Sequence, residues 1–143
     1  MFDKININSS VSAYAQIENE AMFAVASGAL KAGDRLPSAQ ELGKRVNINA
    51  NTVAKAYRDL QVMEIVYTRR GMGVYINEGA EAKCQEVCRK RIVGRMYEVI
   101  SEAKAAGMSA VDINSVVKAS FESGGSIYGE IPAAVLAVGK KQK

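Results

Sequence analysis

The sequence predicts a mostly α-helical fold with one small β-hairpin. Three observations carry this prediction. Two capped helical patterns with a tight connection lie between residues 39 and 60, two β-prone runs flank a glycine-bearing turn near residue 72, and a long amphipathic helical pattern begins near residue 80. The first two features in this order are typical of a winged helix-turn-helix. We therefore expect such a domain over residues 1–78 and a helical segment over residues 79–143.

A first helix is expected to run to about Ser27. Ser9, Ser10 or Ser12 can cap its start, because a serine hydroxyl accepts a hydrogen bond from a free backbone N–H of the first turn. Gly28 can close its end in a left-handed conformation. Its broad apolar face indicates a scaffold helix rather than a binding element.

The second and third helices form the predicted helix-turn-helix. Ser38 and Glu41 make an S-x-x-E capping pattern, so a helix is expected over residues 39–46. Residues 47–48 leave room for only a tight connection, and Asn49 can cap the next helix. The apolar face of that third helix is expected to comprise Val53, Ala56, Tyr57 and Leu60.

The start of the third helix has an unusual composition outside its apolar face. Its small and polar residues are Asn49, Ala50, Asn51, Thr52, Ala54 and Lys55. Short side chains let a helix approach the major groove closely, and amides and hydroxyls can reach base edges and phosphates. An ordinary exposed helix face is the alternative interpretation of this helix taken alone.

The hairpin is expected within residues 65–77. Arg69 and Arg70 lie beside its tip, and Gly71 and Gly73 lie in its turn. Glycine lets a backbone approach another surface, and arginine suits phosphates and narrow minor grooves. A basic hairpin directly after a helix-turn-helix unit favours a wing that contacts DNA.

The second half predicts a helical dimerisation region. A long helix is expected over residues 80–106, ended by Gly107, and Ser109 with Asp112 predicts a capping box before a shorter helix. Two such amphipathic helices cannot bury their apolar faces alone, so we expect a second copy to cover them. The candidate dimerisation residues are Val87, Ile92, Met96, Val99, Ile100, Val116 and Phe121. The alternative is that these helices fold onto their own winged domain.

The end of the chain leaves two interpretations open. A glycine-rich hinge precedes the apolar run AAVLAV at residues 133–138, and the basic residues GKKQK follow at 139–143. The apolar run can act as a strap on the dimer partner, or it can stay flexible until something binds.

Composition limits the possible functions. The chain carries a net charge of +4 and has no histidine, so it lacks the commonest general base and metal ligand. We expect no enzyme, no cofactor and no metal. The N-terminus has no secretory signal pattern and no apolar run suits a membrane span, so we expect a cytoplasmic protein. The six cations within residues 44–70, against only two acids, are Lys44, Arg45, Lys55, Arg58, Arg69 and Arg70.

The two cysteines, Cys84 and Cys88, lie four apart on the predicted long helix. Small apolar side chains on one helix face are the simpler interpretation. A redox-responsive pair is the alternative, although parallel side chains about 6 Å apart suit a strain-free bridge poorly.

Residues 5–77 resemble the DNA-binding domain of the GntR family of bacterial transcription regulators. The resemblance rests on AYAQIENE, SGALKAGDRLPSAQEL, NxNTVxKAYRDL and RRGMGVYI. The asparagine-rich third helix and the short remaining chain are similar to the YtrA subfamily. The resemblance implies that the third helix is the recognition helix and that proteins of this kind pair through short C-terminal helices.

Departures from the family pattern limit how much can be transferred. Gln40 stands where the family commonly has a DNA-contacting arginine, and Ala50 and Ala54 stand where some relatives have arginines. Glu64 replaces a usual glycine just before the wing. Base reading by arginine is therefore expected to be weaker here than in those relatives.

These observations together predict a homodimeric, sequence-specific DNA-binding regulator, a repressor at a roughly palindromic operator. Its partners would be double-stranded DNA and a second copy, with the effector unknown. A winged-helix protein-interaction module and a redox-responsive regulator are the alternatives. The candidate DNA-contacting residues are Ser38, Gln40, Lys44, Arg45, Asn49, Asn51, Thr52, Lys55, Arg58, Arg69, Arg70, Gly71 and Gly73.

Overall fold

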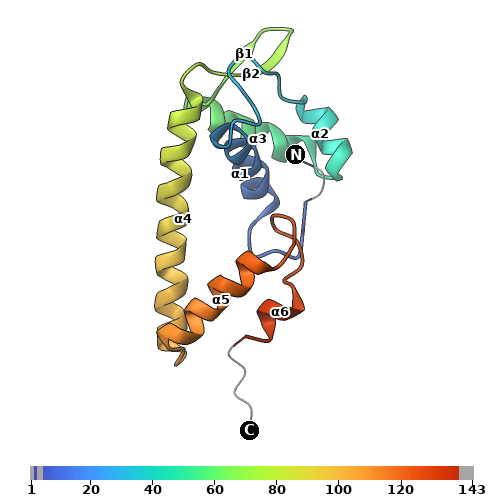
Figure 1. The fold of residues 1–143 in the computed structure, drawn as a ribbon. Coiled ribbons are helices and arrows are strands. Elements are labelled where there is room, and N and C mark those ends of the chain that lie inside the picture. Colours follow the sequence, from blue (N-terminus) through green and yellow to red (C-terminus); the bar gives the residue numbers. More distant parts are fainter. Residues whose placement is uncertain (1, 3–4, 139–143) are drawn as a thin grey trace. The chain divides into compact units, whose positions relative to one another are not determined.

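The computed structural model describes residue 2 and residues 5–138, and it confirms the mostly helical fold with a two-stranded hairpin (Figure 1). The basic end of the tail, residues 139–143, lies outside the described residues. Contacts divide the chain into two compact units, Met1–Lys90 and Arg91–Lys143. The elements in order are α1 (Ala13–Ala26), α2 (Ala39–Val46), α3 (Ala50–Val62), β1 (Val66–Arg69), β2 (Gly73–Ile76), α4 (Ala80–Ala105), α5 (Ala110–Glu122) and α6 (Ala133–Leu136).

The predicted caps begin three of the helices in the first unit. The Ser12 side chain accepts a hydrogen bond from the backbone of Ala15, and Ser38 accepts one from Glu41 at 3.0 Å. The Asn49 side chain accepts one from the backbone N–H of Asn51 at 2.8 Å. Each such cap is worth roughly 1 kcal/mol, because it satisfies an N–H that has no partner within the helix.

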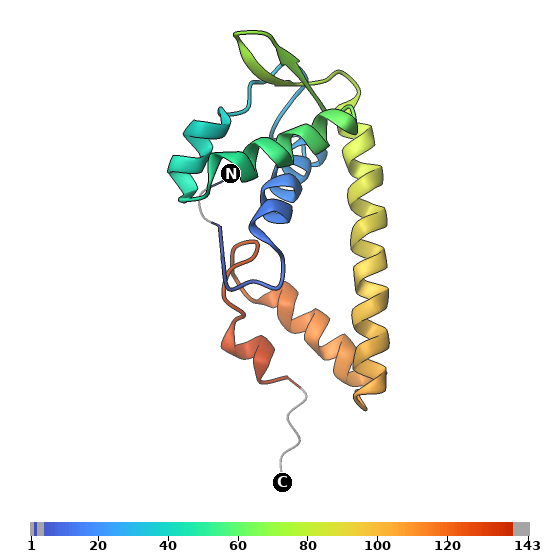
Figure 2. The same cartoon turned by 180° about the vertical axis from the view of Figure 1, so that it is seen from behind.

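The core of the first unit lies where α1 and α2 pack against α3 (Figure 2). All four residues predicted for the inner face of α3 are buried. Ile17, Leu42 and Leu60 are fully buried, and each contributes roughly 1.5–3 kcal/mol of transfer free energy. This packing fixes α3 on its inner face and leaves its outer face in solvent.

The hairpin is antiparallel, with Val66 opposite Ile76 and Arg69 opposite Gly73. The segment before α2 adds a short third row, because Arg35 forms a β-bridge with Tyr75. The backbone N–H of Leu36 donates to the carbonyl of Val74 at 2.9 Å. The hairpin is therefore held on both sides of β2.

The start of α4 belongs to the core of the first unit. Ala80 and Cys84 are almost completely buried there, and Val87 packs partly buried against the same cluster. Val87 therefore contacts its own winged domain. The predicted domain boundary at residue 78 remains a prediction, since α4 continues without a break from one unit into the other.

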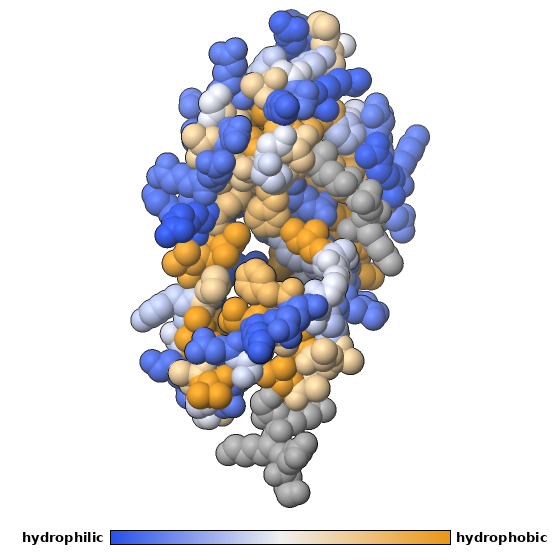
Figure 3. Space-filling view, viewed as in Figure 1, coloured by the Kyte–Doolittle hydropathy of each residue, from blue (hydrophilic) through white to orange (hydrophobic). Residues whose placement is uncertain are grey.

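The second unit contains the rest of α4 together with α5 and α6. The predicted capping box is present, with the Ser109 hydroxyl accepting from the Asp112 N–H and the Asp112 carboxylate accepting from the Ser109 N–H. None of the described residues from 89 to 138 is buried. Hydrophobic residues lie on the surface where α5 runs (Figure 3). Among the described residues, no helix combines the length and the hydropathy of a membrane span.

Candidate nucleic-acid interface

The N-terminal half of α3 presents polar side chains to solvent. Asn49 and Asn51 are exposed and Thr52 is half-buried, whereas Val53 is completely buried. The burial of Val53 orients the helix, so its polar start stays accessible. Asn49 uses its side-chain carbonyl oxygen for the cap, so its amide N–H₂ is still able to donate hydrogen bonds.

A stripe of exposed side chains continues along α3. Asn51, Lys55 and Arg58 are spaced by four and three residues, which places them on one helix face. The Lys55 Nζ lies 4.9 Å from the centroid of the Tyr14 ring, a cation–π contact with α1. This contact holds Lys55 toward α1 and makes Tyr14 a neighbour of the stripe, which the sequence did not indicate.

The turn between α2 and α3 depends on Gly43. Asn47 ends α2 in the left-handed conformation (φ 56°), and the Ile48 N–H donates to the Gly43 carbonyl at 2.8 Å. A Cβ on Gly43 would lie only 2.7 Å from the Ile48 carbonyl oxygen and 3.4 Å from the Ala50 Cα. Ala50, the first residue of α3, can pack this close to α2 only because residue 43 has no side chain.

A shallow concavity of about 250 Å³ lies between the start of α2, the side of α3 and the hairpin. Ser38, Arg58 and Gly73, three of the predicted residues, line it together. The Tyr57 hydroxyl donates to the Pro37 carbonyl at 2.7 Å and ties α3 to the segment before α2. Burial raises the pKa of Tyr57 far above its usual value, so this hydroxyl stays protonated and keeps donating.

Gln40, Lys44 and Arg45 are all exposed on α2. Lys44 and Arg45 also lie in its last turn, where positive charge stabilises the negative end of the helix dipole. Their charges therefore have a local structural role, and any role toward DNA is additional.

The hairpin tip exposes two cations and a bent backbone. Arg69, Arg70 and Gly71 are exposed, and Gly73 is half-buried. Gly71 (φ 74°) and Gly73 (φ 118°) have backbone conformations that side chains disfavour. The Arg69 Cζ lies 5.9 Å from the centroid of the Tyr75 ring, a cation–π contact within the hairpin.

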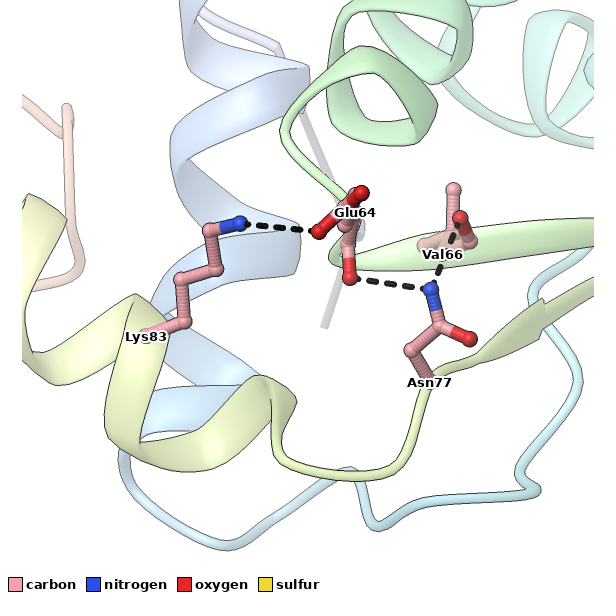
Figure 4. Close-up of polar contacts among 4 residues, drawn as sticks. All are labelled: Glu64, Val66, Asn77 and Lys83. Atoms are coloured by element: carbon pink, nitrogen blue, oxygen red, sulfur yellow. Dashed lines mark hydrogen bonds and ion pairs between the residues drawn. The ribbon is translucent and has the colours of Figure 1, made fainter.

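The base of the hairpin contains the Glu64 departure from the family pattern (Figure 4). Glu64 has the left-handed φ of 61° that a glycine would adopt freely. The Asn77 side-chain amide donates to the Glu64 carbonyl at 2.9 Å, and the Glu64 carboxylate lies 3.6 Å from the Lys83 Nζ. The chain therefore holds an unfavourable backbone conformation with one hydrogen bond and one exposed ion pair.

The two cysteines are free and buried in the core of the first unit. Burial raises the pKa of the Cys84 thiol to about 11. A neutral, buried thiol is a poor nucleophile, which argues against a redox-sensing role for Cys84.

Six of the seven candidate dimerisation residues lie in the second unit, apart from Val87. Ile92, Met96, Val99, Ile100 and Val116 line one apolar groove of about 380 Å³ between α4 and α5. Phe121 lies outside this lining and is 88% exposed. The structure thus gathers five of these side chains into a single surface.

Comparison with known proteins agrees with this geometry. The family described as "Bacterial regulatory proteins, gntR family" matches residues 13–76. The chain is 34% identical over 115 residues to the HTH-type transcriptional repressor YtrA of Bacillus subtilis (strain 168), covering 80% of this chain and 88% of that protein.

Solved structures give the same result. A GntR family transcriptional regulator from Listeria monocytogenes is 30% identical, with a TM-score of 0.60 over 80% of this chain and 97% of that chain. YtrA from Sulfolobus acidocaldarius, a GntR-family transcription factor, is 25% identical, with a TM-score of 0.50 over 82% of this chain and 96% of that chain. These similarities cover the second unit in part as well as the winged domain.

Proposed function

The chain belongs to the GntR family of bacterial transcription regulators, and on this premise we propose that it is a homodimeric repressor of a roughly palindromic operator. α3 would enter the major groove of each half-site, and the hairpin would contact the adjoining minor groove. Asn51, Thr52 and Gln40 would read bases or position the helix. The exposed lysines and arginines would hold phosphates.

The observation that carries this proposal is the exposed outer face of α3. Its inner face packs on α1 and α2, while Asn51 and Arg58 are exposed and have no structural partner among the described residues other than the Asn51 backbone cap. Amide and guanidinium groups are the side chains that contact base edges and phosphates. Arg69 and Arg70 extend the positive charge to the hairpin, where it favours a polyanion.

The dimer is supported by the second unit, whose described residues are all at least partly exposed. Val99 is 59% exposed and Met96 is 50% exposed in the single chain, both within the same apolar groove. Contiguous apolar surface of this kind marks an association site. A symmetric pair would set two recognition helices about 34 Å apart, or a multiple of that distance, on a palindromic site.

Repression is proposed from the relative named as a transcriptional repressor, which aligns with most of this chain. A dimer seated on an operator that overlaps a promoter would exclude polymerase from it. No bound effector is required for this mode of action.

Binding is tested by selecting duplexes from the host genome with the purified protein and measuring affinity by fluorescence anisotropy across salt concentrations. Because phosphate contacts release counterions, log Kd should rise steeply and linearly with log salt. Recovery of no duplex above background, or an affinity independent of salt, would refute the proposal and favour a protein-interaction module.

Dimerisation is tested separately by sedimentation equilibrium. Val99→Asp, which buries a charge if the groove is covered, should give monomers. Tyr97→Asp is the matched control, because Tyr97 is 74% exposed and does not line the groove. Equal behaviour of the two variants would reject the groove as the dimer interface.

A further inference from the structure

The outer face of the hairpin carries a feature that the predicted residues do not include. Residues directly opposite each other in an antiparallel pair share a face, so Tyr67 with Tyr75 and Arg69 with Gly73 project to the same side. The two tyrosine rings stack with centroids 5.7 Å apart. The bridge between Arg35 and Tyr75 adds Arg35 to this face from the neighbouring row.

The Arg35 side chain occupies the space above Gly73. A Cβ on Gly73 would lie 2.8 Å from the Arg35 Nε and 3.5 Å from its Cζ. Arg69 lies directly across the strand pair from the same glycine. Two guanidinium groups therefore flank a residue that has no side chain.

Neither guanidinium is neutralised by the protein. Over the part of the chain that the structure describes, Arg35 and Arg69 form no ion pair with a carboxylate, and both are exposed. The Arg69 guanidinium lies over the Tyr75 ring, a contact that leaves its charge in place. Two guanidinium groups without an ion pair, on either side of a residue that has no side chain, favour an anion that can accept several hydrogen bonds.

This face is different from the one that borders the recognition helix. The side chains of Thr68 and Val74 project to the opposite face and line the concavity beside α3, which the backbone of Gly73 also borders. A duplex in contact with α3 and the hairpin tip would present phosphates to both sides of the hairpin.

We propose that Arg35, Gly73 and Arg69 form a phosphate site on the outer face of the wing. The inference rests on the proposed DNA-binding function and adds Arg35 as a contact that anchors the wing from the side away from α3. Each of the two guanidinium groups donates to a phosphate of the duplex backbone, and the absent side chain of Gly73 makes room for the Arg35 guanidinium on this face. Because the contact is to the backbone, it strengthens binding to all sequences alike.

The experiment measures Kd against salt for one duplex that the wild-type protein recovers from a random-sequence pool. Loss of one phosphate contact lowers the slope of log Kd against log salt by about 0.9. Arg35→Ala should lower the slope by that amount and weaken binding about tenfold at low salt. Arg35→Lys keeps the charge and should keep the slope, with a smaller loss of affinity.

Arg89→Ala is the matched control, since Arg89 is an exposed cation of the same unit on α4. It should leave slope and affinity unchanged.

A double-mutant cycle adds a second measurement. Gly73→Ala displaces the Arg35 side chain, so it should cost less affinity in the Arg35→Ala background than in the wild type.

If Arg35→Ala kept the wild-type slope of log Kd against log salt, the proposal would be overturned even if affinity fell. Arg35 would then stabilise the hairpin without contacting a phosphate. Equal losses for Arg35→Ala and Arg89→Ala would also overturn it, because the effect would be one of net charge. Failure of the wild-type protein to recover any duplex refutes DNA binding itself, an outcome distinct from both.

Discussion

Gly43 offers the sharpest test of how α2 positions the start of α3. Helix propensity alone predicts that Gly43→Ala stabilises the protein by about 1 kcal/mol, because alanine loses less entropy in a helix. The structure predicts the opposite sign. The new Cβ would lie 2.7 Å from the carbonyl oxygen of Ile48 and 3.4 Å from the Cα of Ala50, and both are backbone atoms.

Relief of this contact requires the turn to shift by several tenths of an ångström. Overpacking of this kind costs about 1–3 kcal/mol, which equals or exceeds the gain of about 1 kcal/mol in helix propensity. We therefore expect Gly43→Ala to lower the free energy of unfolding, by up to about 2 kcal/mol. The same shift moves the start of α3, so DNA affinity should fall as well.

Urea denaturation followed by circular dichroism measures the change. Gly94→Ala is the matched control, because Gly94 also lies within a helix and a Cβ there would meet nothing within 4 Å. It should raise stability by about 0.5–1 kcal/mol. If Gly43→Ala stabilises the protein as Gly94→Ala does, then the close approach of α2 and α3 is wrong.

Three further predictions follow from single sites. Glu64→Gly should stabilise the protein by about 0.5–1 kcal/mol in urea denaturation, because it relieves a left-handed conformation and loses only an exposed ion pair. Glu64→Gln keeps the left-handed conformation and should not stabilise the protein, so equal effects of the two variants would show that residue 64 is not strained. Asn51→Ala should change the preference among operator variants by about 1–3 kcal/mol at one base pair, whereas Arg70→Ala should weaken binding to all duplexes alike. Competition binding with single-base variants of the operator distinguishes the two effects, and an unchanged preference in Asn51→Ala would show that Asn51 does not read a base. Burial raises the pKa of the Cys84 thiol from 9.0 to about 11 in the folded state, so the thiol of the unfolded chain ionises first and the free energy of unfolding should decrease as pH rises from 9 toward 11. Cys84→Ala should not show that decrease, and rapid alkylation of native Cys84 at pH 8 would contradict its burial.

The sequence by itself determined the elements from α1 to α5 and their order, whereas the short helix α6 was not predicted. The caps at Ser38, Asn49 and Ser109 act between residues two or three apart, so they are readable from the chain. The glycines of the hairpin turn and the apolar spacing of α3 are equally local. For this reason the helix-turn-helix, the hairpin and the long helix after them were all predicted close to their observed bounds.

Only the tertiary structure decided which residues meet across the fold. Arg35 reaches Gly73, the first turns of α4 enter the core of the winged unit, and Lys55 rests on the ring of Tyr14. The role of Gly43 follows only from the position of the Ile48 carbonyl oxygen, which a Cβ on residue 43 would approach to 2.7 Å. These contacts join separate elements, and their geometry follows from how the helices pack. Local hydrogen bonds and side-chain periodicity involve residues only a few positions apart, so they do not specify which elements pack together.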